Sequence, residues 1–293
     1  MKLSLILTLF FASVANSYLL PTPGSGDCGI SSSTDDFVGR KETNLDEFPW
    51  LALLGYKNKN DDSLKFLCIG ALINSRYVLT TAACVLLRNS NLSVVRLGEW
   101  DLDATNDCDS TGCTDAIQEI PVEEVIKHSE YKLSRKAPKH NNIALLRLET
   151  PVKLNKFVKP LCLPMKNQTD EASNFIFAGW SLPGFFQDRL SKKSKIKLKI
   201  VDQETCKQSN EKFSLEIMES QFCAVGETSG IDTCGGDGGG PLVALRDDGK
   251  GGKYYYAAGL VSYGTKICGD PKTLGVYTRV SSFLDWIEEN VKE

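Results

Sequence analysis

The stretch that decides the fold reads Ile231-Asp232-Thr233-Cys234-Gly235-Gly236-Asp237-Gly238-Gly239-Gly240-Pro241-Leu242. Within it, Gly238 stands between Asp237 and two further glycines. Glycine has no side chain, so position 238 offers neither a hydroxyl nor a thiol for nucleophilic attack. Any function assigned to this stretch therefore has to work without a covalent intermediate at Gly238.

The stretch resembles the nucleophile loop of the chymotrypsin-family serine proteases, which has Ser where this chain has Gly238. Two further segments carry the same resemblance and a similar loss. Thr80-Thr81-Ala82-Ala83-Cys84 puts Ala83 at the position of the histidine base, and Asn141-Asn142-Ile143-Ala144-Leu145-Leu146 puts Asn142 at the position of the aspartate. An amide cannot stabilise an imidazolium, and in the family this change alone lowers turnover about 10⁴-fold.

The resemblance extends from Phe37 to Glu293 and implies an all-β fold. This expected fold consists of two packed six-stranded antiparallel β-barrels and a C-terminal helix. The first barrel is expected at about 37–155, the second at about 156–280 and the helix at 281–292. The apolar residues of 281–291 have helical spacing, which fits the last of these assignments.

The N-terminus predicts export from the cell. Residues 1–17 combine Met1-Lys2, an apolar run too short to span a bilayer and a small-residue cleavage site, which is typical of a secretory signal. The even number of cysteines, 10, indicates a disulfide framework in an oxidising compartment. The sequons at Asn91 and Asn167 are compatible with surface glycans. We therefore expect a secreted, extracellular protein.

Residues 18–36 are rich in Pro, Gly, Ser, Thr and Asp and are predicted to form a tethered tail. Phe37-Val38-Gly39-Arg40 then resembles the Ile-Val-Gly-Gly start of the family's catalytic domain. In the family, a cut before this start frees an ammonium group that inserts beside the aspartate preceding the nucleophile. Because no Lys or Arg lies between Tyr18 and Gly39, a trypsin-like activator has no cleavage site here. Asp237 would then need other donors, because a buried unpaired charge is costly.

Among the chymotrypsin family, the chain is most similar to the arthropod clip-domain group, which acts in prophenoloxidase and Toll-type cascades. The clip module needs six cysteines before the equivalent of Cys28, so no clip domain is expected here. Spacing alone cannot select a disulfide pattern. The resemblance implies the pairs Cys68–Cys84, Cys206–Cys223, Cys234–Cys268 and Cys28–Cys162, the last joining tail to body, and leaves Cys108 and Cys113 to pair within a short loop.

The resemblance also implies a remnant of a substrate pocket. Asp232 lies six residues before Gly238, where an aspartate selects Arg or Lys side chains in the family. Gly264 and Gly275 match the pocket walls that admit a long cation. The pocket is either used for binding without cleavage or is an inherited relic, and the sequence leaves both alternatives open.

The segment from Leu97 to Cys108 resembles the calcium loop of trypsin-like enzymes. Glu99, Asp101 and Asp107 would be the side-chain ligands of a structural Ca²⁺, which prefers several oxygen ligands. The alternative, an acidic solvated loop, is equally open.

Three lysines alternate with apolar residues in the segment from Ser194 to Ile200, which predicts a strand with a lysine row on one face. The lysines are Lys195, Lys197 and Lys199. Since a polyanion or partner site usually has more adjacent like charges, we expect a solvated outer face. The formal net charge of −3 likewise gives no general reason to expect nucleic acid or a membrane as partner.

These features predict a secreted serine protease homologue without catalytic activity. The two histidines, His128 and His140, both lie outside the base position. The protein would be a binding regulator, acting as adaptor, cofactor or decoy towards proteases or their substrates in arthropod immunity, melanisation or venom. The alternative is a degenerate hydrolase with residual or altered activity, which a fluorophosphonate label would distinguish.

Overall fold

The computed structural model describes most of the chain after the predicted signal segment. The described residues are 20–33, 36–58, 63–87, 89–132, 139–166, 172, 174–181, 190–211, 215–234, 236–264 and 274–292. The predicted signal at 1–17, the sequon Asn167 and Cys268 lie outside these ranges.

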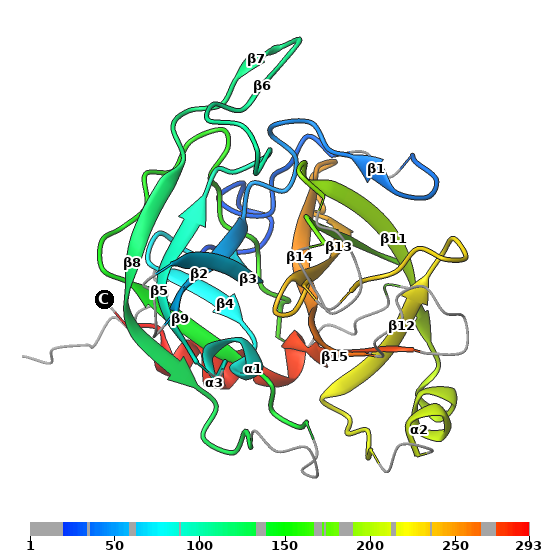
Figure 1. Ribbon diagram of the computed structural model, residues 1–293. Coiled ribbons are helices and arrows are strands. Elements are labelled where there is room, and N and C mark those ends of the chain that lie inside the picture. Colours follow the sequence, from blue (N-terminus) through cyan, green and yellow to red (C-terminus); the bar gives the residue numbers. More distant parts are fainter. Residues whose placement is uncertain are drawn as a thin grey trace, which may run out of the picture.

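The first half of the chain closes into an antiparallel barrel, on the left in Figure 1. Its strands follow the order β2-β3-β4-β9-β8-β5 around the ring. They are β2 (Leu51–Asn58), β3 (Leu64–Leu72), β4 (Tyr77–Thr80), β5 (Ser90–Leu97), β8 (Gln118–Lys127) and β9 (Ala144–Leu148). All four residues of β4 are buried, which fits a strand covered on both faces.

The second half forms a second antiparallel ring, in which β11 pairs with both β10 and β12. Its strands are β10 (Asn174–Gly179), β11 (Ser194–Val201), β12 (Gln221–Gly226), β13 (Pro241–Asp247), β14 (Lys253–Tyr263) and β15 (Gly275–Arg279). The short strand β1 (Lys41–Glu42) adds to the outer edge of β11. The predicted pair of six-stranded barrels is therefore confirmed.

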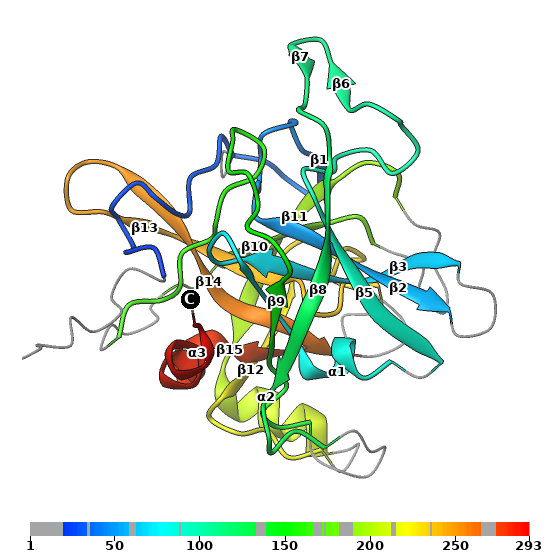
Figure 2. The same cartoon turned by 90° about the vertical axis from the view of Figure 1, so that its left-hand side faces the viewer.

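One hairpin projects from the body, as Figures 1 and 2 show. It consists of β6 (Cys108–Asp109) and β7 (Gly112–Cys113), joined by a disulfide between Cys108 and Cys113. Three further disulfides join Cys28 to Cys162, Cys68 to Cys84 and Cys206 to Cys223. These are the pairings that the resemblance implied. Cys234 is also disulfide-bonded.

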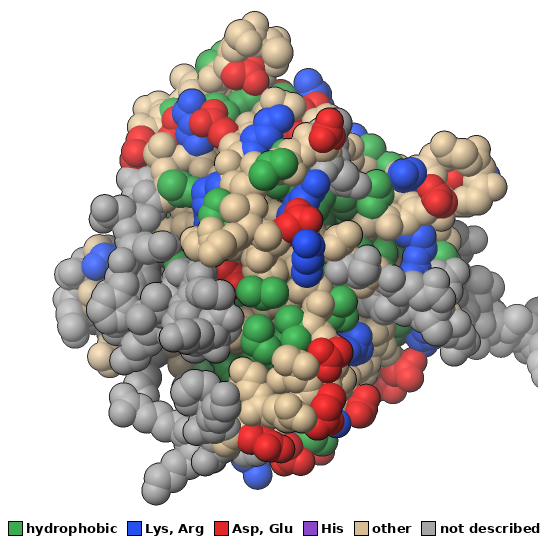
Figure 3. Space-filling view, turned by 90° about the vertical axis from the view of Figure 1, so that its right-hand side faces the viewer, with side chains coloured by type: hydrophobic (Ala, Val, Ile, Leu, Met, Phe, Trp, Pro, Cys, Tyr) green, Lys and Arg blue, Asp and Glu red, His purple; other side chains and the backbone are tan. Residues whose placement is uncertain are grey.

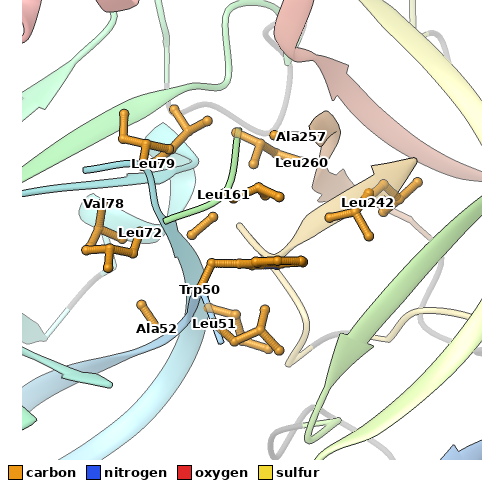
Figure 4. Packing of buried hydrophobic residues seen from close by; sticks show 14 of the residues in the cluster. Trp50, Leu51, Ala52, Leu72, Val78, Leu79, Leu161, Leu242, Ala257 and Leu260 are labelled. Carbon is orange, nitrogen blue, oxygen red and sulfur yellow. The ribbon is translucent and has the colours of Figure 1, made fainter. Parts of the chain in front are cut away.

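One large apolar core runs through both barrels, and a small second cluster lies around the disulfide between Cys206 and Cys223. Trp50 is completely buried in the large core, and Figure 4 shows it next to Leu51. Its ring lies 5.8 Å from those of both Phe48 and Tyr255, the latter on β14. Aromatic contacts of this kind add to the energy of burial, so the junction between the barrels is well packed.

The C-terminal helix begins later and ends earlier than the predicted range 281–292. A 3₁₀ turn over Val280–Phe283 precedes α3 (Leu284–Asn290), which buries Leu284 and Ile287. The other helices are α1 (Ala82–Val85) and α2 (Gln203–Glu211). No helix in the described part of the chain has the length and apolar character needed to cross a bilayer.

The tail is built into the body beyond its predicted tether. Gly29 donates its amide to Pro160 O at 2.9 Å and accepts the Tyr255 amide at 2.9 Å. Gly29 has φ +68°, and a Cβ there would lie 2.1 Å from Tyr255 O, so only glycine fits this approach. Cys28, beside it, is buried. The tail thus contributes backbone pairing to barrel 2.

The predicted solvated lysine face is wrong for Lys195. Its side chain is 1% exposed, and its ammonium lies 2.9 Å from Glu47 Oε1 and 3.0 Å from Ser33 Oγ. Lys199 does remain at the surface, where it pairs with Glu227 at 3.5 Å. Basic and acidic side chains are interspersed on the face of barrel 2 in Figure 3. The three lysines therefore do not form one exposed row, because the tail and the segment before β2 cover the end of β11 that carries Lys195.

Candidate active site

The fold brings the three triad-matching positions together. Ala83 lies in α1 shortly after β4, and Asn142 shortly precedes β9. Because β4 and β9 are neighbours in barrel 1, Ala83 N–H can donate to Asn142 Oδ1 at 2.8 Å. Gly238 comes from barrel 2, yet its carbonyl accepts the Ile69 amide of β3 at 3.0 Å. Cys84 Sγ lies 3.4 Å from the same carbonyl oxygen.

The Asn142 side chain is fixed at both ends of its amide. Its Oδ1 faces the Ala83 amide, and its Nδ2 donates to Ser262 Oγ at 2.8 Å. The residue is 1% exposed. The amide therefore fills its hydrogen-bonding needs with protein groups and carries no charge with which to stabilise a protonated base.

Gly238 is not forced to be glycine by its surroundings. A Cβ built there would meet Cys84 Sγ at 3.7 Å and Cys68 Sγ at 3.8 Å, which are ordinary contacts. Its neighbour Gly239 differs, because it has φ +79° and a Cβ there would lie 2.2 Å from Thr80 Oγ1. The backbone path of the loop therefore requires Gly239 but leaves room for a side chain at 238.

Both histidines have other environments. His128 packs against the rings of Phe283 and Trp286, with centroids 5.6 and 5.4 Å away, and partial burial lowers its pKa below the ordinary value. His140 is half-buried, with Nε2 3.1 Å from Glu216 O. Within the described chain, the contacts of both rings are made with groups other than Ala83, Asn142 and Gly238.

Asp232 is buried, with its carboxylate turned onto the protein backbone. Oδ1 accepts the Thr233 amide at 2.7 Å, and Oδ2 accepts the Gly226 amide at 3.1 Å. Burial raises its pKa, and these amides oppose the rise. Since each carboxylate oxygen has further lone pairs, a cation could share the group but would find it already solvated by amides.

The two predicted wall glycines face each other. A Cβ on Gly264 would lie 3.8 Å from the Cα of Gly275, and one on Gly275 would lie 2.8 Å from the Tyr277 hydroxyl. That hydroxyl is 2.8 Å from Thr233 Oγ1. The structure thus gathers Gly264, Gly275 and the neighbour of Asp232, as the pocket resemblance implied, while residues 265–273 lie outside the described chain.

Asp237 is completely buried beside this region. Its Oδ2 accepts the Cys234 amide at 2.8 Å, and its Oδ1 makes no ordinary hydrogen bond within the described residues. Burial raises the pKa of Asp237 to about 6, while the Cys234 amide, the positive charge of Arg40 and the Ser181 backbone oppose that rise. The Cys234 amide thus binds one oxygen of this buried carboxylate, and an uncut chain before Phe37 stays a prediction.

Sequence reasoning missed two residues of this region, Arg40 and Ser262. Ser262 binds the amide of Asn142, and Arg40 donates to the hydroxyls of Ser181 and Ser194. A signal for Arg40 was present in the sequence: the segment Phe37-Val38-Gly39-Arg40 has a charged residue where the family's Ile-Val-Gly-Gly start has its second glycine. No comparable signal identified Ser262.

The predicted calcium ligands are engaged by the chain itself. Glu99 forms an ion pair with Arg96 at 2.9 Å, and Asp107 accepts the amides of Trp100 and Asp101 at 2.6 and 2.9 Å. Within the described ranges, no group of three or more His, Cys, Asp or Glu side chains is arranged to hold a metal ion. Calcium binding at this loop therefore stays a prediction.

Of the two predicted glycan positions, Asn91 lies within the described residues. Asn91 is exposed on β5, near the end where this strand begins. Its side chain is therefore accessible to a glycan, and glycosylation there stays a prediction.

Comparisons with known proteins agree with this geometry. The family model described as Trypsin matches residues 37–287. Phenoloxidase-activating factor 3 of Holotrichia diomphalia is 41% identical over 92% of this chain and 76% of its own length. CLIP domain-containing serine protease B4 of Anopheles gambiae is 36% identical over 92% of this chain and 74% of its own length.

Solved structures give the same result. The crystal structure of the Drosophila Grass clip serine protease of the Toll pathway superposes with a TM-score of 0.76 and 30% identity, covering 89% of this chain and 73% of that one. Mouse neuropsin gives a TM-score of 0.67 and 28% identity, covering 87% of this chain and 100% of that one. The chain therefore belongs to the trypsin family, and its relatives include insect clip-domain serine proteases.

Proposed function

We propose that this protein is a non-catalytic member of the trypsin family that acts by binding other proteins in an extracellular protease cascade. The observation that carries the proposal is Gly238. Its loop is held by one backbone hydrogen bond to Ile69 of barrel 1 and by others to Val261 of barrel 2, and it keeps room for a side chain, yet it has no nucleophile. The loop thus keeps its conformation and lacks only the reactive side chain.

Two further substitutions support the proposal independently. Ala83 provides no base, and the uncharged Asn142 amide is already bound by Ala83 and Ser262. In enzymes of this mechanism, removal of the triad leaves only about 10³ to 10⁴-fold acceleration over water. Because so small an acceleration remains without the triad, we favour a binding role over a degenerate hydrolase with residual or altered activity.

The cascade setting is supported by the relatives. Besides phenoloxidase-activating factor 3, they include the Drosophila proteins named Spaetzle-processing enzyme and Melanization protease 1. These names favour arthropod immunity and melanisation over a venom setting. The disulfides support an oxidising, extracellular compartment. Partners of this chain would accordingly be proteases or protease substrates, which it engages as adaptor, cofactor or decoy.

A hydrolysis assay tests the non-catalytic part of the proposal. The secreted wild-type protein is incubated with Arg and Lys ester and amide substrates, since Asp232 stands at the position that selects basic side chains. We expect no turnover above that of a heat-unfolded sample. Turnover that is abolished by Gly238→Ala or Asn142→Ala, but not by an exposed control such as Lys199→Ala, would overturn the proposal.

A further inference from the structure

The second barrel carries a hollow of about 330 Å³ on its sheet. Cavities of about this size and above hold small ligands in many proteins. Its walls come from β10, β11, β13 and β14 and from residues beside them. The lining residues on which the inference depends are Ile176, Lys197, Glu227, Val243, Leu245 and Tyr255. Ala83, Asn142 and Gly238 are not among its described lining residues, so the hollow is separate from the candidate active site.

The register of the strands gives the hollow an apolar floor. Ile176 of β10 pairs with Val243 of β13 on one side and with Lys197 of β11 on the other. Residues directly opposite each other in an antiparallel sheet share a face, so these three side chains form a row. Leu245 lies two positions after Val243, on the same face, and pairs with Tyr255 of β14. The floor is therefore apolar and has a lysine at one end.

The two charged side chains of the hollow have different partners. Glu227 forms an ion pair with Lys199 at 3.5 Å. Lys197 is half-buried, and its ammonium lies 4.9 Å from the centre of the Phe37 ring. The lysines two positions before and after it both pair with a carboxylate, whereas Lys197 forms no ion pair within the described part of the chain. The hollow thus combines an apolar floor with a cation that lacks an acidic partner there.

We propose that this hollow binds a small carboxylate with an apolar body. The body would pack on Ile176, Val243 and Leu245, and the carboxylate would accept a charge-assisted hydrogen bond from the Lys197 ammonium. A cationic ligand fits less well, because Glu227 already has Lys199 as its partner and Lys197 would repel a second cation. The inference holds whether or not the protein cleaves a substrate.

Calorimetry with three probes of similar shape tests the proposal on the full secreted protein at neutral pH. The probes are phenylbutyrate, phenylbutanol and phenylbutylamine, which end in a negative, a neutral and a positive group. We expect phenylbutyrate to bind with a Kd of about 1 mM, and the alcohol and the amine to bind at least about tenfold more weakly, because they lose the hydrogen bond between two charged groups. Equal affinity for the three probes, a preference for the amine, or no binding of any probe would overturn the proposal.

Matched variants then locate the site. Lys197→Met keeps the length of the side chain and removes its charge, so it should weaken phenylbutyrate binding about tenfold and leave phenylbutanol binding unchanged. Lys253→Met removes an exposed lysine outside the hollow and should behave like the wild type. Glu227→Gln removes a negative charge from the lining and should strengthen phenylbutyrate binding.

Leu245→Trp should fill the hollow and abolish binding of all three probes. If this variant does not fold, the comparison of Lys197→Met with Lys253→Met still decides the question, since both lysines reach the surface. Unchanged phenylbutyrate affinity in Lys197→Met, or in folded Leu245→Trp, would contradict the proposed site.

Discussion

The triad-matching positions Ala83 and Gly238 differ from the buried Asp237 in what they keep of the family's pattern. Ala83 and Gly238 are half-exposed and simply lack the reactive groups, while the surrounding backbone hydrogen bonds remain. Asp237, by contrast, keeps its acidic side chain, which is completely buried and accepts the Cys234 amide. The difference has a physical basis. A reactive side chain at a cleft can be removed without leaving a charge behind, whereas a buried carboxylate is costly unless its charge is compensated.

The largest expected effect comes from restoring the triad. Because a Cβ at 238 makes only ordinary contacts, the variant Ala83→His, Asn142→Asp, Gly238→Ser should fold. We expect it to hydrolyse Arg or Lys esters at least about 10³-fold faster than the wild type, since the triad acts as a unit. Gly238→Ser alone should gain nothing, because base and carboxylate are still missing.

The matched control for this variant carries Gly238→Ala with the other two changes and should be inactive. Equal hydrolysis by this control and by the restored variant would contradict the assignment of position 238 as the site of the missing nucleophile.

A second prediction concerns the buried pair Lys195–Glu47, which anchors the segment around Phe37. Lys195→Met removes the ammonium that is 2.9 Å from the buried Glu47 and leaves that carboxylate with the Asn44 amide and the charge of Lys193, so it should lower the free energy of unfolding by about 3 kcal/mol. The control is Lys199→Met on the same strand, whose partner Glu227 is exposed. That change should cost at most about 1 kcal/mol. Similar losses for the two variants in urea unfolding would show that burial of Lys195 does not matter.

A third prediction follows from the pKa of Asp237, which burial raises to about 6 from 3.8. The folded state binds this proton more tightly than the unfolded state, so stability is lost as the pH rises from about 4 to about 6. The loss from this group should reach about 3 kcal/mol above that window. Urea unfolding across this range should show a smaller fall in Asp237→Asn than in the wild type. Equal pH dependence in the two proteins would contradict the assignment.

The smallest effect is expected at Asp232, where backbone amides already bind both carboxylate oxygens. Benzamidine needs only the pocket and not the triad, and we expect it to bind weakly, with a Kd of about 1 mM or about −4 kcal/mol. Calorimetry should show this binding abolished in Asp232→Ala. No binding to the wild type, or equal binding to both, would identify the pocket as a relic and direct the search for partner contacts to the surface loops.

The barrels, four disulfides and the loop around Gly238 could be predicted because they depend on long motifs in a fixed order. The environment of Lys195 could not. Alternation along a strand says which residues share a face, but Glu47, which covers Lys195, lies 148 residues away in the sequence. Arg40 was out of reach for a related reason. The motif gave its position on the chain, whereas its contacts with Ser181 and Ser194 depend on how both barrels fold.

The central claim is that Gly238 leaves this protein without a nucleophile, and fluorophosphonate labelling tests it most directly. The secreted wild-type protein and the triad-restored variant are incubated with the probe, and their intact masses are measured. The account predicts an unchanged mass for the wild type and one adduct, on Ser at 238, for the variant. A stoichiometric adduct on folded wild-type protein, absent after unfolding, would contradict the account.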